Sequence, residues 1–167
     1  MRAFLDTNFL LDCVLPGRPE HGAAQTTKGL VDVGLIEGVV SACSLKDAYY
    51  ILTKQAGEAR AREVVRDCLK SYSVEPLDQE ACFTSAYSDE PDFEDGCIRA
   101  MAERAGVDFI ITRDRAAFVR STIKTFSPAE FIRAFPIPET MLWNACTADR
   151  HIGDCPRHGG SPVADAR

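Results

Sequence analysis

The chain has 167 residues, of which 46% are hydrophobic and 26% charged, a composition typical of a soluble globular protein with one domain. The formal net charge of -6 argues against nucleic-acid binding through a broadly basic surface, but it is compatible with a nuclease whose carboxylates hold metal ions. Apolar runs are too short to span a bilayer, and Asp6 interrupts the N-terminus before any signal-peptide core. We therefore expect a cytoplasmic protein without a membrane partner, whose cysteines, seven in number, are mostly reduced and buried.

Strands and helices are predicted to alternate along residues 1–135. The first half contains a strand ending at Leu5, helices over 9–14 and about 20–35, a strand over 38–42, and a helical hairpin over 45–69 with Ser44 as its cap. The second half contains a strand over 72–74, a helix capped by Asp78, a helix ended by Gly106, strands over 107–112 and 123–126, and a helix begun by Ser127. This order predicts an α/β fold with a mostly parallel sheet and helices on both faces. Residues 136–167 lose periodicity and are predicted to form a disordered or loosely packed tail.

Four acidic residues are placed where such a fold would bring them together. Asp6 and Asp114 directly follow the first and fourth strands, Asp47 is expected in the first turn of the helix after the second strand, and Asp95 opens the helix before the fourth. The carboxyl ends of parallel strands and the N-termini of the next helices share one rim, where ligands bind. Clustered carboxylates need a cation, and oxygen ligands without His or Cys favour Mg²⁺ or Mn²⁺. Such ions support hydrolysis of a phosphodiester by water.

Asp6 and Asp47 each have a structural alternative. Asp6 could merely cap the helix that follows it, but an acid directly after an apolar strand favours a functional role. Ser44 and Asp47 have the spacing of a capping box, which leaves Asp47 equally well explained as a cap or as a ligand. Asn8 could be a second cap, or it could hold Asp6 and a metal-bound water, and we favour the second.

The acidic segment around Asp95 is also open to more than one interpretation. Asp92 and Asp95 have capping-box spacing too, and helical geometry does not choose between Glu94 and Asp95. Asp114 could belong to a turn. Arg113 and Arg115 follow the fourth strand and could contact substrate phosphates, although a solvated surface explains them equally well.

Three motifs in order resemble the PIN domain family, nearest to bacterial VapC-type toxins. They are LDTNFLLD at 5–12, DFED at 92–95 and IITRD at 110–114, with SPAEF at 127–131 closing a region of about 1–135. The resemblance implies a three-layer α/β/α sandwich and Mg²⁺- or Mn²⁺-dependent endoribonuclease activity. It places the metal ligands on Asp6, Asp95 and Asp114, favours Asp95 over Glu94, and puts Asp47 where the family often has Glu. Asn8, Thr112, Glu94 and Asp92 are expected to support them.

The same resemblance implies an RNA substrate, a small antitoxin partner and a homodimer. A degenerate PIN domain that binds RNA or protein without cutting is the main alternative. A haloacid dehalogenase-type phosphatase also begins with an Asp after its first strand, but Asn8 stands where that family needs a second Asp, so we rank it lower.

Overall fold

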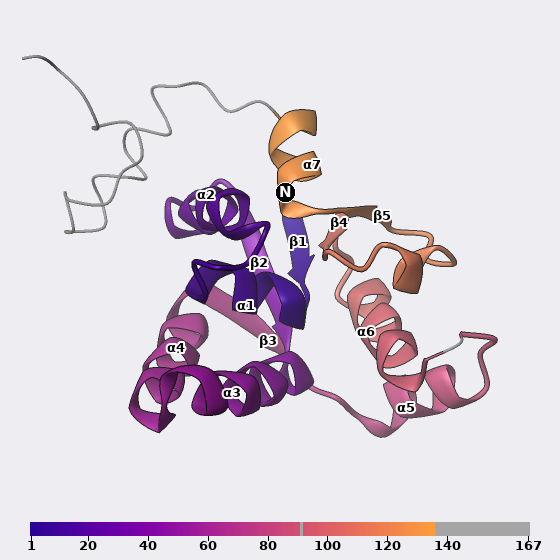
Figure 1. The fold of residues 1–167 in the computed structure, drawn as a ribbon. Coiled ribbons are helices and arrows are strands. Elements are labelled where there is room, and N and C mark those ends of the chain that lie inside the picture. Colours follow the sequence, from indigo (N-terminus) through magenta and orange to yellow (C-terminus); the bar gives the residue numbers. More distant parts are fainter. Residues whose placement is uncertain (91, 136–167) are drawn as a thin grey trace, which may run out of the picture.

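A five-stranded parallel sheet forms the centre of the molecule (Figure 1). We analysed a computed structural model, which describes residues 1–90 and 92–135. The strands are β1 (Arg2–Leu5), β2 (Glu37–Ser41), β3 (Tyr72–Glu75), β4 (Phe109–Ile111) and β5 (Lys124–Phe126), in the order β3-β2-β1-β4-β5. Phe4 of β1 lies opposite Val39 of β2 and Ile110 of β4. The predicted parallel α/β sheet is therefore confirmed.

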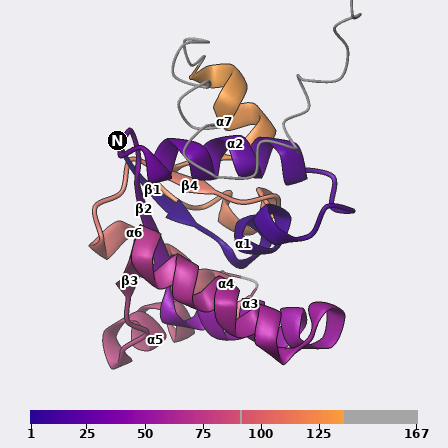
Figure 2. The ribbon, with the colours of Figure 1, turned by 90° about the vertical axis from the view of Figure 1, so that its left-hand side faces the viewer.

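Helices cover both faces of this sheet. One face carries α1 (Thr7–Val14), α2 (His21–Asp32), α3 (Ala42–Ala56), α4 (Glu58–Ser71) and α7 (Pro128–Ala134). The other carries α5 (Gln79–Ala86), α6 (Phe93–Arg104) and the short 3-10 helix η1 (Ala116–Phe118). Helices α2 and α7 lie side by side, and α3 and α4 pair as the predicted hairpin (Figure 2). The layers are those of an α/β/α sandwich, as predicted.

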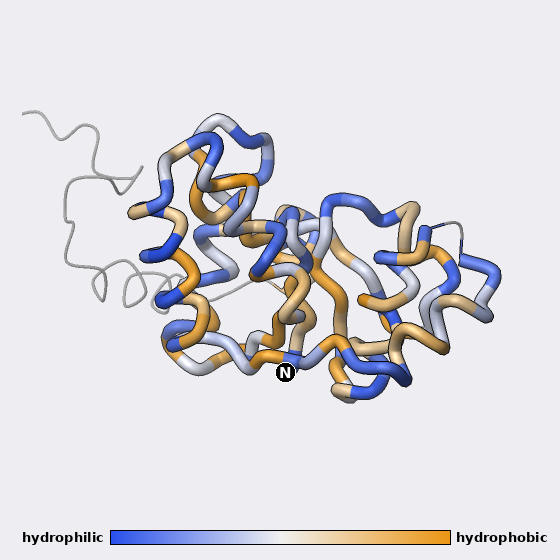
Figure 3. Tube along the Cα trace, turned by 90° about the horizontal axis from the view of Figure 1, so that it is seen from below, coloured by the Kyte–Doolittle hydropathy of each residue, from blue (hydrophilic) through white to orange (hydrophobic). Residues whose placement is uncertain are grey.

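Successive strand residues divide between the two cores. Leu5 and Ile111 are buried against the first face, whereas their neighbours Phe4 and Ile110 are buried against the second. Adjacent side chains of a strand point to opposite faces, so a continuous apolar run is what a doubly covered strand requires. In Figure 3 the hydrophobic colour gathers in the interior and the hydrophilic colour on the outer turns.

The helix caps agree with the sequence in most places. Ser127 and Glu130 form the predicted capping box of α7, and Asp78 caps α5 as predicted. The predicted cap of α3 is wrong, because Ser41, the last residue of β2, accepts a hydrogen bond from the Ser44 backbone N–H at 2.8 Å. The chain passes directly from strand to helix, so α3 begins earlier than its apolar spacing suggested.

Strand β4 is shorter than the predicted 107–112. Only Phe109–Ile111 pairs with β1, opposite Ala3, Phe4 and Leu5. The predicted tail at 136–167 lies outside the described residues. In the part of the chain that the structure describes, no helix combines the length and apolarity required to cross a bilayer.

Candidate active site

The acids of interest lie where the strand order reverses. From β1 the chain adds β2 and β3 on one side, then returns to add β4 and β5 on the other. Asp6 follows β1 and Thr112 follows β4, which are neighbours in the sheet. A crevice outside the carboxyl ends of strands at such a switch point is the usual ligand site of open α/β sheets.

Asp6 is a buried carboxylate, 6% exposed, at the start of α1. It accepts hydrogen bonds from the Thr7 backbone N–H at 2.5 Å and from the Thr112 hydroxyl at 2.7 Å, with the Asn8 amide at 3.5 Å. Burial raises the pKa of Asp6, and these hydrogen bonds lower it in part. Asp6 is thus both the cap of α1 and a desolvated acid.

Thr112 connects Asp6 to Asp114. Its fully buried hydroxyl donates to Asp6 and accepts the Asp114 backbone N–H at 3.0 Å. The Asp114 carboxylate accepts from the Ala117 backbone N–H at 3.3 Å, so it also supports the turn into η1. The turn role considered for Asp114 is therefore present.

Asp95 lies close enough to Asp6 and Asp114 to feel their charges. Burial raises the pKa of Asp95 to about 6, and the charges of Asp92, Asp6 and Asp114 add to that rise. Asp92 caps α6, accepting from the backbone N–H groups of Glu94 at 2.8 Å and Asp95 at 3.2 Å. Three acids that are distant in sequence therefore share one region.

Glu94 faces a different neighbour. It is more exposed than Asp95, and burial raises its pKa, followed by the charges of Asp47 and Asp6. Asp47 lies beyond the first turn of α3 and pairs with Lys46 at 2.8 Å. Its predicted position in the first turn and its capping role are both wrong, because Ser41 starts the helix. Asp47 lies on the Glu94 side of the acidic region.

The sequence interpretation missed a second set of charges beside Asn8. Asp12 is 0% exposed and pairs with Arg18 Nε at 2.5 Å and Arg113 Nε at 3.2 Å. Arg18 and Arg113 also donate to Asn8 Oδ1, at 2.9 and 3.3 Å. An acid inside the apolar run of α1 was the signal for a buried, paired carboxylate. Arg115, by contrast, pairs with Glu130 of α7.

The acidic residues fit a hard cation by chemistry, although they do not form a closed cage. Within residues 1–90 and 92–135, no three Asp, Glu, His or Cys side chains are gathered as metal ligands. The charges of Asp6 and Asp114 nonetheless add to the raised pKa of Asp95, and the three acids offer only oxygen donors. A dication would relieve that repulsion by drawing the carboxylates toward it.

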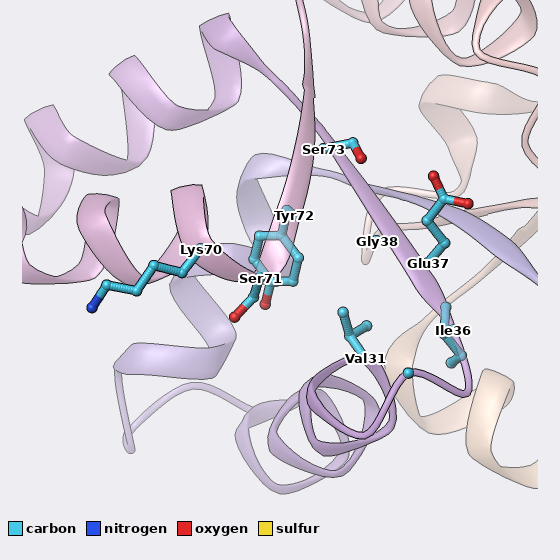
Figure 4. Close-up of a pocket in the computed structure, with 9 residues that line it drawn as sticks. Val31, Ile36, Glu37, Gly38, Lys70, Ser71, Tyr72 and Ser73 are labelled. Carbon is cyan, nitrogen blue, oxygen red and sulfur yellow. The ribbon is translucent and has the colours of Figure 1, made fainter.

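One open pocket, of about 430 Å³, lies at the opposite edge of the sheet (Figure 4). Glu37 and Tyr72, the first residues of β2 and β3, line it together with Val31 and Lys70. It contains none of the residues predicted for the active site. The candidate active site is the acidic region at the carboxyl edge, because Asp95 there is affected by the charges of Asp6 and Asp114.

The fold and the acids define an α/β/α domain with an acidic switch point. Residues 2–116 match the family model described as PIN domain. This match spans more than half of the chain, so the chain belongs to the PIN domain family. A comparison with curated proteins found no significant match.

Several solved structures share the fold. VapC20 of Mycobacterium tuberculosis, described as a sarcin-ricin loop cleaving toxin, is 20% identical with a TM-score of 0.57, over 70% of this chain and 95% of that one. A toxin-antitoxin complex from Klebsiella pneumoniae is also 20% identical, with a TM-score of 0.57 over 75% and 97% of the two chains. DNA-bound VapBC from Salmonella typhimurium is 18% identical, with a TM-score of 0.55 over 77% and 98%. The predicted VapC-type PIN fold is confirmed.

Proposed function

We propose that this PIN domain is a metal-dependent endoribonuclease that hydrolyses RNA phosphodiester bonds. The observation that carries the proposal is the pKa of Asp95, which burial and the charges of Asp92, Asp6 and Asp114 raise to about 6. Carboxylates that oppose one another's ionisation at a switch point are what a site built for a cation requires. The likeness to a structure described as a cleaving toxin supports the choice of hydrolysis.

The residues of the site have different proposed roles. Asp6, Asp95 and Asp114 would hold Mg²⁺ or Mn²⁺, with Asp47 and Glu94 at one side of the site. When bound, such an ion supplies an activated water and stabilises negative charge on the phosphate. Thr112 fixes the Asp6 carboxylate through its 2.7 Å hydrogen bond.

We further propose that the protein is the toxin of a toxin-antitoxin pair. Similar structures are described as VapBC and toxin-antitoxin complexes, which supports a small antitoxin as a partner of this chain. A homodimer remains part of the same proposal. Gel filtration with multi-angle light scattering tests the dimer, because a monomeric mass at micromolar concentration contradicts it.

A cleavage assay tests the enzymatic proposal. The purified protein is incubated with single-stranded and structured RNA in Mg²⁺, in Mn²⁺ and in EDTA. Asp95→Asn should abolish the metal-dependent cleavage, because it removes a charged ligand without changing side-chain size. Asp67→Asn, on the exposed surface of α4, is the matched control and should cleave as the parent does. Cleavage that persists in EDTA or in the Asp95 variant contradicts the proposal.

A non-catalytic PIN domain is the second candidate, and two points favour it. The described acids are not gathered into a ready metal cage, and Asp47 is shorter than the Glu often found there in the family. Under this alternative the parent binds RNA in Mg²⁺ or Mn²⁺ but leaves it intact. The same assay therefore separates the two functions.

A further inference from the structure

Two arginines are held beside the acidic site by one buried carboxylate. Arg18 comes from the loop between α1 and α2, and Arg113 follows β4. Asp12, which is 0% exposed, pairs with Nε of both, at 2.5 and 3.2 Å. The Arg113 pair is the looser one, since its Nε and Asp12 Oδ2 lack hydrogen-bond alignment. One arginine would suffice to neutralise Asp12, so the second leaves a net positive charge.

The arginines keep donors for another ligand. A guanidinium carries five N–H donors, and the contacts with Asp12 and Asn8 involve only Nε and Nη2 of each. The Arg18 and Arg113 side chains are 21% and 30% exposed, so neither is fully buried. Paired guanidinium forks match the geometry of phosphate oxygens.

Asn8 links this arginine pair to the acids. Its Oδ1 accepts from both arginines, at 2.9 and 3.3 Å, which turns its amide nitrogen toward Asp6 Oδ2 at 3.5 Å. The positive charges are thus fixed one side chain away from Asp6. In a chain with a net charge of -6, a polyanion approaching this edge needs such local cations.

We propose that Arg18 and Arg113, positioned by the buried carboxylate of Asp12 and by Asn8, bind a backbone phosphate of single-stranded RNA next to the phosphate that is cut. The inference rests on the proposed function for its substrate. Asp12 is a positioning residue here, because it acts through the arginines without touching the RNA. The arginines fix the strand so that the neighbouring phosphate lies over Asp6.

Binding without cleavage tests this proposal separately from catalysis. Each variant is made in an Asp95→Asn background, and its Kd for a short fluorescein-labelled single-stranded RNA is measured in Mg²⁺ across a salt series. Arg18→Gln and Arg113→Gln should each weaken binding roughly tenfold at low salt. Each should also make the fall of log K, the association constant, with log salt less steep by about 0.7, the value for one phosphate contact on a single strand. Arg66→Gln, on the exposed surface of α4, is the control and should change neither quantity.

Asp12→Asn separates positioning from general electrostatics. The substitution removes a negative charge at nearly constant size, so long-range electrostatics alone predicts tighter RNA binding. Positioning predicts weaker binding, because both guanidiniums lose their anchor. Tighter or unchanged binding by a folded Asp12→Asn protein overturns the role of Asp12.

Folding controls keep the outcome decisive. Circular dichroism and Tm are measured for every variant, and Arg18→Lys and Arg113→Lys replace any Gln variant that does not fold. The Lys variants keep the charge but lose the fork, so they should retain the salt slope and weaken binding several-fold. Arginine variants that bind as the parent does overturn the proposal. A parent that binds RNA without cutting it overturns the proposed function and leaves the binding result valid.

Discussion

Replacing Asp95 with asparagine should stabilise the metal-free protein at neutral and alkaline pH. Burial and the charges of Asp92, Asp6 and Asp114 raise the pKa of Asp95 from 3.8 to about 6. A carboxyl group with a higher pKa in the folded protein binds its proton more tightly there than in the unfolded chain. Its contribution to stability is therefore present at acidic pH and is lost as pH rises through about 6. Asparagine does not ionise, so the variant does not lose this stability as pH rises.

The magnitude follows from the size of the pKa change. A rise from 3.8 to about 6 corresponds to about 3 kcal/mol, at about 1.36 kcal/mol per pKa unit. Asp95 is only partly buried, and solvent screening reduces this to about 1–2 kcal/mol. The lost interaction of an acid with the N-terminus of α6 costs about 0.3–1 kcal/mol. The net gain is about 1 kcal/mol, or about 3 °C in Tm at pH 8.

Thermal unfolding of both proteins in EDTA at pH 4 and pH 8 measures the effect. The difference in Tm should appear at pH 8 and disappear at pH 4, where the parent carboxyl is largely protonated. Asp67→Asn should show no such pH-dependent gain. Adding Mg²⁺ or Mn²⁺ at pH 8 should raise the Tm of the parent more than that of Asp95→Asn, because binding to the folded state stabilises it. An Asp95→Asn protein that is no more stable than the parent at pH 8 refutes the electrostatic reasoning.

Three further predictions concern the structure around the site. Thr112→Val keeps the shape of the side chain but removes the hydroxyl that donates to Asp6. It should lower the free energy of unfolding by about 2 kcal/mol in urea unfolding and slow RNA cleavage. Thr112→Ser keeps a hydroxyl and should restore both stability and cleavage. Ser41→Ala removes the cap of α3 and should lower the free energy of unfolding in urea by about 1 kcal/mol. Asp47→Asn should lower it by less than about 0.5 kcal/mol. An equal loss of stability in both variants contradicts the assignment of Ser41 as the cap. Gly96→Ala would push a methyl group of α6 into the Ser85 side chain of α5. Tm should fall by an amount equivalent to about 1–3 kcal/mol. An unchanged Tm means that α5 and α6 separate easily.

Local sequence determined most of the secondary structure, because caps and periodicity act within a few residues. Ser127 and Glu130 form the capping box that their spacing predicted, and the apolar run at 109–111 is a doubly buried strand. The position of Asp6 after a buried strand likewise followed from pattern alone. Ser44 was predicted to cap α3, but Ser41 is the cap, because the chain passes directly from β2 into the helix.

Tertiary structure decided how the charged groups meet. The hydrogen bond between Thr112 and Asp6 joins residues far apart in sequence, and only the pairing of β1 with β4 brings them together. The same holds for Asp12, Arg18 and Arg113, whose ion pairs need a loop and a strand end to converge. Burial and neighbouring charge set proton affinity and pairing, and both depend on segments that no local pattern encodes.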